Sequence, residues 1–324
     1  MTKTVRFQQK SRVAMGLIVV LTMFLGGILR GAQSYLAVDS FSGKILLELD
    51  SGRRSAAGGL TKVATAMVVL DWARLSKTSM AEVAVVPVGA SGRGGANPMG
   101  LLPGDRISLR EAMYSMLLGA DDVAAYTLAD HAGRSIQTRS GGRSPIAAFV
   151  SEMNNLARVL GMTGTRFATP EGTVSGGRGD HSTARDLAAL TIYAMRNAGF
   201  RFYVKQRERT IGSFRGNAKR SFKVSNTHTL VGTGNVNGVI NGGVVGTGYA
   251  VATSSERKAE VTKLPGGGSS VLPRRLIIIA LGNPDPWSVT RALIEQGWPT
   301  YNAWRQQGSP VNRAAEVIRV AVPQ

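Results

Sequence analysis

Residues 53–75 read RRSAAGGLTKVATAMVVLDWARL, and this stretch decides how the rest of the chain must be arranged. Within it, residues 63–70 are all apolar except Thr65. A helix that is apolar on every side is typical of the middle of a domain, so we expect a central helix here. At its first turn, Gly59 and Lys62 are three residues apart and therefore share a face. A lysine at the mouth of a buried helix is costly unless it is paired or used in chemistry.

Length and composition predict a folded chain that needs no cofactor. The chain has 324 residues, of which 43% are hydrophobic and 18% charged, and this is enough for one large core or two modest ones. It has no cysteine, which excludes disulfides, cysteine-ligated zinc and a thiol nucleophile. The three histidines, His131, His181 and His228, are too scattered to predict a metal cluster. We therefore expect neither a metal nor a cofactor.

Residues 1–32 are typical of an export signal. Four basic residues between positions 3 and 12 precede an apolar run over residues 13–29, and the small residues Gly31 and Ala32 follow it. The run favours a cleaved signal peptide, and an uncleaved membrane anchor is the alternative. Either one predicts a protein in the periplasm or on the extracytoplasmic face of the cytoplasmic membrane, which touches the membrane only through this segment.

The chain is strongly basic, with a formal net charge of +19. Such a surface attracts polyanions. In an exported protein, the available polyanions are anionic wall polymers and lipid headgroups. The basic residues are scattered and no nucleic-acid motif accompanies them, so we do not expect a nucleic-acid ligand.

Strand-like runs at both ends of the chain enclose a helical middle. Residues 35–39 and 44–49 flank Ser-Phe-Ser-Gly, which is a hairpin signal. Capping and periodicity predict further elements: a strand over 82–86, helices from 109, over 123–131, over 145–161, from 183 to about 197 and over 288–296, a polar loop over 133–144, and late strands over 221–224, 244–253 and 275–281. Strands at both ends with helices between them predict an α+β fold.

Several further strings occur in a characteristic order and spacing: Met-Leu-Leu at 116–118, Asp-Val-Ala-Ala at 122–125, Met-Asn at 153–154, Leu-Gly-Met at 160–162, Pro-x-Gly at 170–172 and His-Ser-Thr-Ala-Arg-Asp-Leu at 181–187. Together with the Gly-x-x-Lys string, they resemble the D-alanyl-D-alanine carboxypeptidase family of low-molecular-mass penicillin-binding proteins. The resemblance implies a DD-peptidase-like domain over 33–298, with an antiparallel sheet from both chain ends beside a helical cluster and the site between them. It leaves residues 299–324 as a C-terminal tail, too short for the second β-rich domain that many relatives carry.

The resemblance also implies an acyl-transfer site in which three motifs meet at a serine nucleophile. In the first motif, Ser-x-x-Lys, Gly59 replaces the nucleophile and Lys62 is retained. In the second motif, Ser-x-Asn, Gly119 replaces the serine and Asp121 replaces the asparagine. A proton-relaying hydroxyl and an amide are therefore both absent.

The third motif of the family, Lys-Thr-Gly, falls on Ile240-Asn241-Gly242. The cation that would bind the substrate carboxylate is thus an isoleucine, and Asn241 and Gly242 remain as vestigial substrate-binding positions. Glycine has no side-chain atom that can attack a carbonyl, and loss of the serine nucleophile alone costs about 10⁶ in kcat in subtilisin. We therefore expect a pseudoenzyme.

Three hydroxyl residues are alternative nucleophiles: Thr61, Ser55 and Ser255. Ser255 begins a second Ser-x-x-Lys string, which we place in a charged hairpin turn after a strand. A Ser-His-Asp triad would draw on Asp180, His181 and His228, but no Gly-x-Ser-x-Gly elbow accompanies them. We expect a packing role for His181.

Asp121 suggests a use for the retained lysine. In the family fold the second motif faces the lysine of the first, so we expect an ion pair between Lys62 and Asp121. The alternative is that both side chains are solvated in an open cleft.

Three functions remain open. The first is an exported, catalytically silent homologue that binds a peptidoglycan stem peptide, an anionic cell-wall polymer or an envelope protein. The second is an active D-alanyl-D-alanine carboxypeptidase with a non-standard nucleophile. The third is an envelope scaffold tethered by the N-terminal segment.

Overall fold

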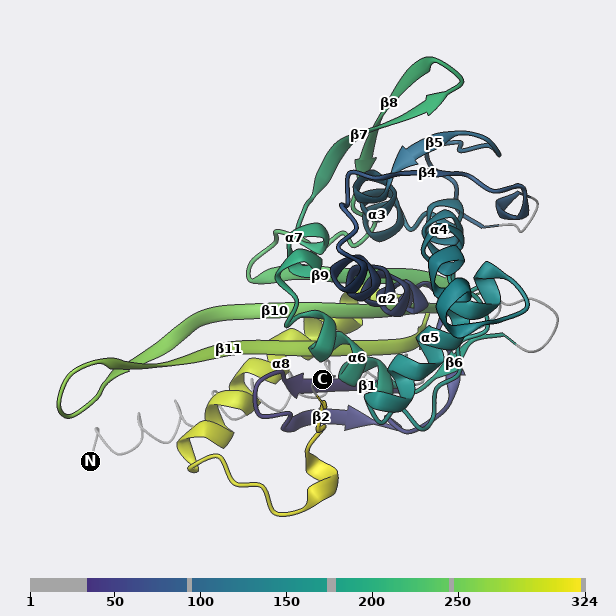
Figure 1. Cartoon of the computed structure of the whole chain (residues 1–324). Coiled ribbons are helices and arrows are strands. Elements are labelled where there is room, and N and C mark those ends of the chain that lie inside the picture. The colour runs from purple at the N-terminus through teal and green to yellow at the C-terminus, as the bar shows by residue number, and fades with distance from the viewer. Residues whose placement is uncertain (1–33, 92–94, 174–178, 245–247, 322–324) are drawn as a thin grey trace, which may run out of the picture.

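Strands from both ends of the chain share one antiparallel sheet (Figure 1). The sheet has five strands in the order β2-β1-β11-β10-β9. The predicted hairpin consists of β1 (Ser34–Asp39) and β2 (Ile45–Leu49), and β1 pairs with β11 (Ser269–Asn283) from the other end of the chain. The sheet is completed by β10 (Gly248–Lys263) and β9 (Val236–Val244). The predicted α+β fold is confirmed.

The computed structural model describes residues 34–91, 95–173, 179–244 and 248–321. The predicted export segment, residues 1–32, lies outside this part of the chain. Among the described residues, no helix is long and apolar enough to cross a membrane.

The predicted central helix is α2 (Thr61–Ser76), which is buried on every side of its first half. It packs against the sheet and against α3 (Leu109–Leu118), α4 (Asp122–Ser140), α5 (Pro145–Val159) and α6 (Ala184–Ala194). Because neighbours surround it, it needs no polar face. It ends at Lys77, which adopts a left-handed backbone conformation.

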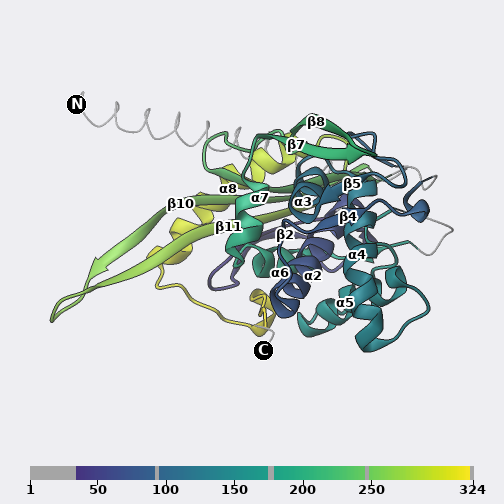
Figure 2. The ribbon, with the colours of Figure 1, turned by 45° about the horizontal axis from the view of Figure 1, so that its top comes forward.

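The sheet separates two apolar layers. Ile277 and Ile279 of β11 face the α2 side, whereas Leu276 and Ile278 face α8 (Pro286–Gln306). This alternation follows from the two-residue period of a strand. Figure 2 shows α8 on one side of the sheet and α2 and α6 on the other.

A second, smaller sheet lies beside the helices and contains β4 (Val83–Val85), β5 (Arg106–Ser108), β7 (Glu208–Arg215) and β8 (Ala218–Ser225) in that order. The predicted strands at 82–86 and 221–224 are therefore confirmed. The remaining elements are short: β3 (Ser55–Ala56), which pairs with β6 (His181–Ser182), α7 (Ala198–Val204), and the 3-10 turns η1 (Gly58–Leu60), η2 (Val88–Ala90) and η3 (Ala314–Glu316).

Two predicted segments in the middle of the chain are wrong. The polar loop over 133–144 is mostly helix, because α4 continues to Ser140. At Gly133, within this helix, the start of α5 comes close. A Cβ at that position would lie 2.2 Å from the carbonyl oxygen of Pro145, so the glycine permits the close approach of α5. The single strand predicted over 244–253 is instead the end of β9 and the start of β10, which run antiparallel.

The C-terminal residues are more ordered than the predicted tail over 299–324. The last helix does not end at 296 but continues through Pro299 to Gln306. Beyond it, Ile318 is buried in the main apolar core, and its backbone nitrogen donates to the carbonyl oxygen of Gly43 at 2.9 Å. The chain therefore returns to the β1–β2 turn after α8.

Candidate functional site

The positions of the first and third motifs are in direct backbone contact. Gly59 lies in η1, immediately before α2, and faces Gly242 of β9. A Cβ on Gly59 would lie 2.9 Å from the Cα of Gly242 and 3.0 Å from the carbonyl oxygen of Asn241. A Cβ on Gly242 would lie 2.5 Å from the Cα of Gly59. Neither position can therefore carry a side chain unless the backbone of β9 or of η1 moves.

Lys62 is buried, with 3% of its surface exposed, and it is paired. Its Nζ lies 2.5 Å from Oδ1 of Asp122 and donates to the carbonyl oxygen of Glu171 at 2.9 Å. The predicted ion pair with Asp121 is wrong, since the partner is the next residue along the chain. Lys62 thus connects the first turn of α2 to the first turn of α4 and to the segment around Glu171.

Asp121 has a different structural role, as the N-cap of α4. Its Oδ1 accepts from the backbone nitrogen of Ala124 at 2.9 Å, and its Oδ2 accepts from the hydroxyl of Ser115 at 2.7 Å. Burial raises the pKa of the Asp121 carboxyl. Asp121, and not the following Asp122, is therefore the cap of α4. Asp122 lies inside the first turn, so its side chain is free to turn toward Lys62.

The remaining motif positions offer neither a hydroxyl nor a cation. A Cβ on Gly119 would lie 3.0 Å from side-chain atoms of Pro98 and Val224, so this position is crowded as well. Ile240 is buried in the main apolar core. The Oδ1 of Asn241 accepts from the hydroxyl of Thr227 at 3.0 Å.

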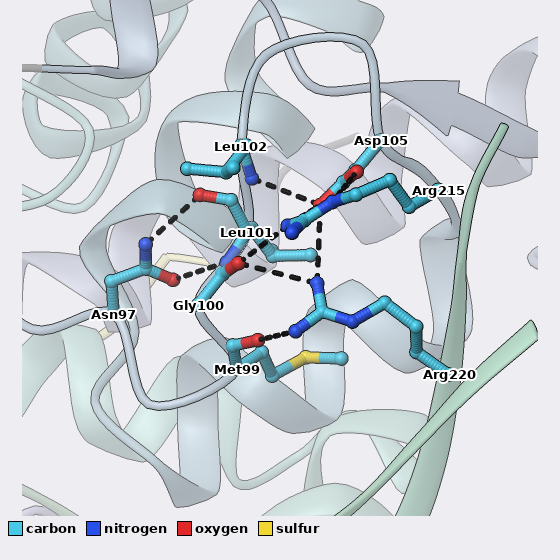
Figure 3. Close-up of polar contacts among 8 residues, drawn as sticks. All are labelled: Asn97, Met99, Gly100, Leu101, Leu102, Asp105, Arg215 and Arg220. Atoms are coloured by element: carbon cyan, nitrogen blue, oxygen red, sulfur yellow. Dashed lines mark hydrogen bonds and ion pairs between the residues drawn. The ribbon is translucent and has the colours of Figure 1, made fainter. Parts of the chain in front are cut away.

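Two arginines of the β7–β8 hairpin, Arg215 and Arg220, hold the loop over residues 97–105 in place (Figure 3). The Nε and Nη2 atoms of Arg215 each donate to a carboxylate oxygen of Asp105 at 2.8 Å, and Nη1 of Arg220 lies 3.4 Å from Oδ2 of the same residue. Arg215 also donates to the carbonyl oxygen of Gly100 at 2.9 Å, and Arg220 donates to that of Met99 at 3.3 Å. The hydrogen bond from Arg215 lowers the pKa of the Asp105 carboxyl. Charge-assisted, bidentate contacts of this kind fix the loop in place.

The three alternative nucleophiles lie in structural positions that differ from one another. Thr61 is buried, and its hydroxyl donates to Oδ2 of Asp180 at 2.8 Å. Ser255 is buried within β10 and accepts from Nε1 of Trp298 at 3.0 Å, so the turn predicted for it is wrong. Trp298 belongs to α8, on the opposite face of the sheet from α2. Ser55 is half-buried in β3, which pairs with β6.

Two of the residues that a Ser-His-Asp triad would draw on have other hydrogen-bond partners. Asp180 accepts hydrogen bonds from Thr61 and from the backbone nitrogens of Ala168 and Thr169, and burial raises its pKa. The Nε2 of His228 lies 2.8 Å from the hydroxyl of Thr253, and burial lowers the pKa of this histidine to about 4.

His181 lies in β6, where its backbone pairs with that of Arg166. The packing role expected for its half-buried side chain stays a prediction. Among the described residues, no group of three or more His, Asp or Glu side chains could hold a metal ion.

Sequence reasoning missed Asp122 and Glu171, which hold the lysine. Two consecutive acidic residues stand at the start of α4 and one of them caps it, so the sequence offered two candidate partners for Lys62 without deciding between them. Glu171 contributes its backbone oxygen, and no side-chain pattern reveals such a contact. The structure therefore brings the predicted positions together, with a backbone contact where the nucleophile would stand.

Comparisons with known proteins show which family the chain is similar to. A sequence model of the D-alanyl-D-alanine carboxypeptidase family matches residues 30–263. The D-alanyl-D-alanine carboxypeptidase DacC of Escherichia coli is 28% identical over 231 residues, which are 69% of this chain and 53% of DacC. The chain thus spans about half the length of that relative. DacB2 of Mycobacterium tuberculosis, another D-alanyl-D-alanine carboxypeptidase, is 29% identical over 275 residues, covering 85% of this chain and 79% of DacB2.

A solved structure shows the same fold. A mutant of a Streptomyces DD-transpeptidase matches with a TM-score of 0.70 and 24% identity, covering 84% of this chain and 98% of that one. The family match extends over well more than half of the chain and includes the first, second and third motif positions. The chain therefore belongs to the D-alanyl-D-alanine carboxypeptidase family.

Proposed function

We propose that this protein is a non-catalytic member of its family, which serves peptidoglycan metabolism by binding rather than by acyl transfer. The contact between Gly59 and Gly242 carries the proposal, because it leaves neither a nucleophile nor the space for one. In an acyl-transfer site the attacking atom must reach the carbonyl of the substrate. Here, backbone occupies the position from which a serine would attack.

The retained lysine also supports loss of catalysis. An ammonium group that contacts a carboxylate and donates to a carbonyl oxygen has its protons engaged in fixed contacts. A general base must instead lie within reach of the proton that it removes. With glycine at position 59, Lys62 has no hydroxyl to activate, and its contacts with Asp122 and Glu171 give it a structural role.

The proposed binding role rests on the positive net charge of the chain. We propose that the protein is exported and that its basic surface engages an anionic polymer of the cell wall. A stem peptide in the vestigial cleft is the weaker candidate, since Ile240 replaces the cation for its carboxylate and Gly59 is packed against β9. An envelope protein is the remaining candidate partner.

Acylation by a fluorescent penicillin tests the loss of catalysis. The purified protein is incubated with the probe, and its intact mass is compared with that of an active carboxypeptidase treated in parallel. We expect no adduct, from protein whose circular dichroism and unfolding transition show that it is folded. An adduct of one acyl group would overturn the proposal, and peptide mapping would then test Thr61, Ser55 and Ser255 as the nucleophile.

Co-sedimentation with purified peptidoglycan sacculi tests the binding role. We expect retention on sacculi that carry their anionic polymers, and loss of retention after these polymers are removed by acid extraction. Equal retention on extracted sacculi would favour the stem peptide instead. The mass of the mature N-terminus, measured on protein from cells, tests export separately.

A further inference from the structure

We propose that a cavity at the far end of strand β9 is a binding site for an oligoanion that carries several phosphate groups. The cavity has a volume of about 670 Å³. It lies between the α6–α7 junction, the β1–β2 turn and the strands β9, β10 and β11. The residues that carry the argument are Arg196, Arg201, Lys205, Asn237, Glu256 and Arg275.

The cavity is separate from the contact between Gly59 and Gly242. Asn237 lies at the start of β9 and Gly242 near its other end, and five residues of strand span about 16 Å. Glu256 and Arg275 lie where β10 and β11 leave the five-stranded sheet and continue as a two-stranded ribbon. Figures 1 and 2 both show this ribbon extending beyond the rest of the fold. The inference therefore does not rest on the proposed loss of catalysis.

The lining carries excess positive charge. Its one acidic side chain, Glu256, is already neutralised: its Oε2 accepts from Nη2 of Arg275 at 3.0 Å and from Nδ2 of Asn237 at 2.8 Å. None of the ion pairs among the described residues involves Arg196, Arg201 or Lys205. Three cations at this cavity are therefore left without a carboxylate partner in the part of the chain that the structure describes.

Backbone carbonyl groups orient the arginines without cancelling their charge. The Nη1 of Arg201 donates to the carbonyl oxygens of Met195 and Arg196 at 2.7 and 2.9 Å, and Nη1 of Arg275 donates to that of Met195 at 3.3 Å. Met195 is the C-cap of α6, so these contacts also satisfy the end of that helix. A guanidinium that is held by carbonyl groups keeps its full charge and presents its other nitrogens in a fixed direction.

These features favour a ligand with several phosphate groups. The planar guanidinium group matches the geometry of phosphate oxygens and binds them through paired hydrogen bonds. The cavity is much larger than one phosphate ion, so a linear segment with several charges fits it better. Another cavity, between α2, α4 and α5, carries opposite charges in equal number, Arg74 and Arg139 with Asp71 and Glu152, and therefore lacks this preference.

Titration with inorganic tripolyphosphate, followed by isothermal calorimetry on the full chain, tests the proposal. The test variant is Arg196→Gln/Lys205→Gln, which removes two exposed cations of the cavity and leaves the helix-capping Arg201 intact. The matched control is Lys219→Gln/Lys223→Gln, which removes the same charge from β8. We expect saturable binding to the wild type and the control, and at least about tenfold weaker binding to the test variant, because hydrogen bonds to charged groups are individually strong.

Several outcomes would overturn the proposal. Equal weakening in both double variants would mean that the general positive charge attracts the anion. Binding of inorganic phosphate as tight as that of tripolyphosphate would exclude a site for several phosphate groups. Binding of poly-glutamate as tight as that of tripolyphosphate would exclude a preference for phosphate, and no saturable binding to the wild type would exclude the site. The unfolding midpoint of each variant confirms that it is folded.

Discussion

Gly59 and Gly242 pack backbone against backbone, so that a Cβ on Gly242 would lie 2.5 Å from the Cα of Gly59. This contact joins the turn that begins the central helix to strand β9. The family resemblance places the nucleophile at the first position and the glycine of the Lys-Thr-Gly motif at the second. By that resemblance, glycine stands at the position of the nucleophile, and the backbone of β9 lies where a side chain on residue 59 would have to go.

Restoring the serine should not restore activity. In Gly59→Ser, the new Cβ would lie 2.9 Å from the Cα of Gly242, so β9 or η1 must shift to accept it. We expect no penicillin adduct and a loss of about 1–3 kcal/mol in the free energy of unfolding, as for other overpacked sites. Urea denaturation and intact mass measure the two effects.

The control for this variant is Gly52→Ser. No heavy atom lies within 4 Å of a Cβ at Gly52, and its backbone is not in the left-handed region. We expect its free energy of unfolding to remain close to that of the wild type. An adduct on Gly59→Ser, or equal stability of the two variants, would contradict the conclusion that the contact between Gly59 and Gly242 leaves no space for a side chain.

Removing either partner of the Lys62–Asp122 pair should be strongly destabilising. Lys62→Met leaves the Asp122 carboxylate without its cation, and Asp122→Asn leaves the ammonium without its anion. The loss of one partner of a buried pair costs about 3–5 kcal/mol, and the double variant should lose less than the two single variants together. Urea denaturation of the complete double-mutant cycle measures this coupling.

Two control variants test whether the loss of stability comes from the Lys62–Asp122 pair itself. Asp121→Asn keeps a good helix cap, so we expect a loss below about 1 kcal/mol. The pair Lys223–Glu208 is exposed on both sides, so Lys223→Met should cause no measurable change. A larger loss in Asp121→Asn than in Asp122→Asn would restore the partner that the sequence suggested.

The contacts of Asp105 with Arg215 and Arg220 should make the free energy of unfolding depend on pH in the acid range. The pKa of this carboxyl is lowered in the folded protein, chiefly by the hydrogen bond from Arg215. The ionised Asp105 carboxylate therefore stabilises the fold at pH values above its unfolded pKa of about 3.9. This stabilisation is lost as the pH falls through the lower pKa of the folded state. We expect Asp105→Asn to unfold at lower urea than the wild type at pH 7, with a smaller difference near pH 3. An equal difference at both pH values would show that the ionised carboxylate is not the source.

Much of the fold was readable from local signals. Ser108, Ser144 and Thr183 each accept a hydrogen bond from the backbone near the start of α3, α5 and α6, as the capping patterns predict. The apolar run of α2 predicted a helix that is surrounded on all sides. One error arose from a glycine that the pattern treats as a loop residue: α4 continues past Gly133, where the absence of a side chain lets Pro145 at the start of α5 lie close.

The sequence predicted which positions lie at the site, but not which of these residues are in contact. The resemblance gave Gly59, Lys62, Asp121 and Gly242 their places, and these residues do lie close together. Which of the two acids, Asp121 or Asp122, pairs with Lys62 depends on the rotation of α4 about its axis. The sequence does not specify this rotation. The closed contact between Gly59 and Gly242 depends on the path of β9, which is set by its pairing with β10.

His228 provides the last prediction, a loss of stability in mild acid. Its side chain is 1% exposed, its Nε2 contacts the hydroxyl of Thr253, and its ring packs against Trp287 at 5.1 Å between centroids. Burial lowers its pKa from 6.5 to about 4. Between these values the unfolded chain binds a proton that the folded protein does not, so stability falls as the pH drops from about 6.5 to about 4.

The difference of about 2.5 pKa units corresponds to about 3 kcal/mol of stability lost across this range. Urea denaturation at pH 7, 5.5 and 4.5 measures it. His228→Gln removes the titrating group and should reduce the dependence on pH, although it lowers stability at pH 7. If His228→Gln keeps the wild-type dependence on pH, then the stability lost in mild acid comes from other groups, and the buried histidine is not its cause.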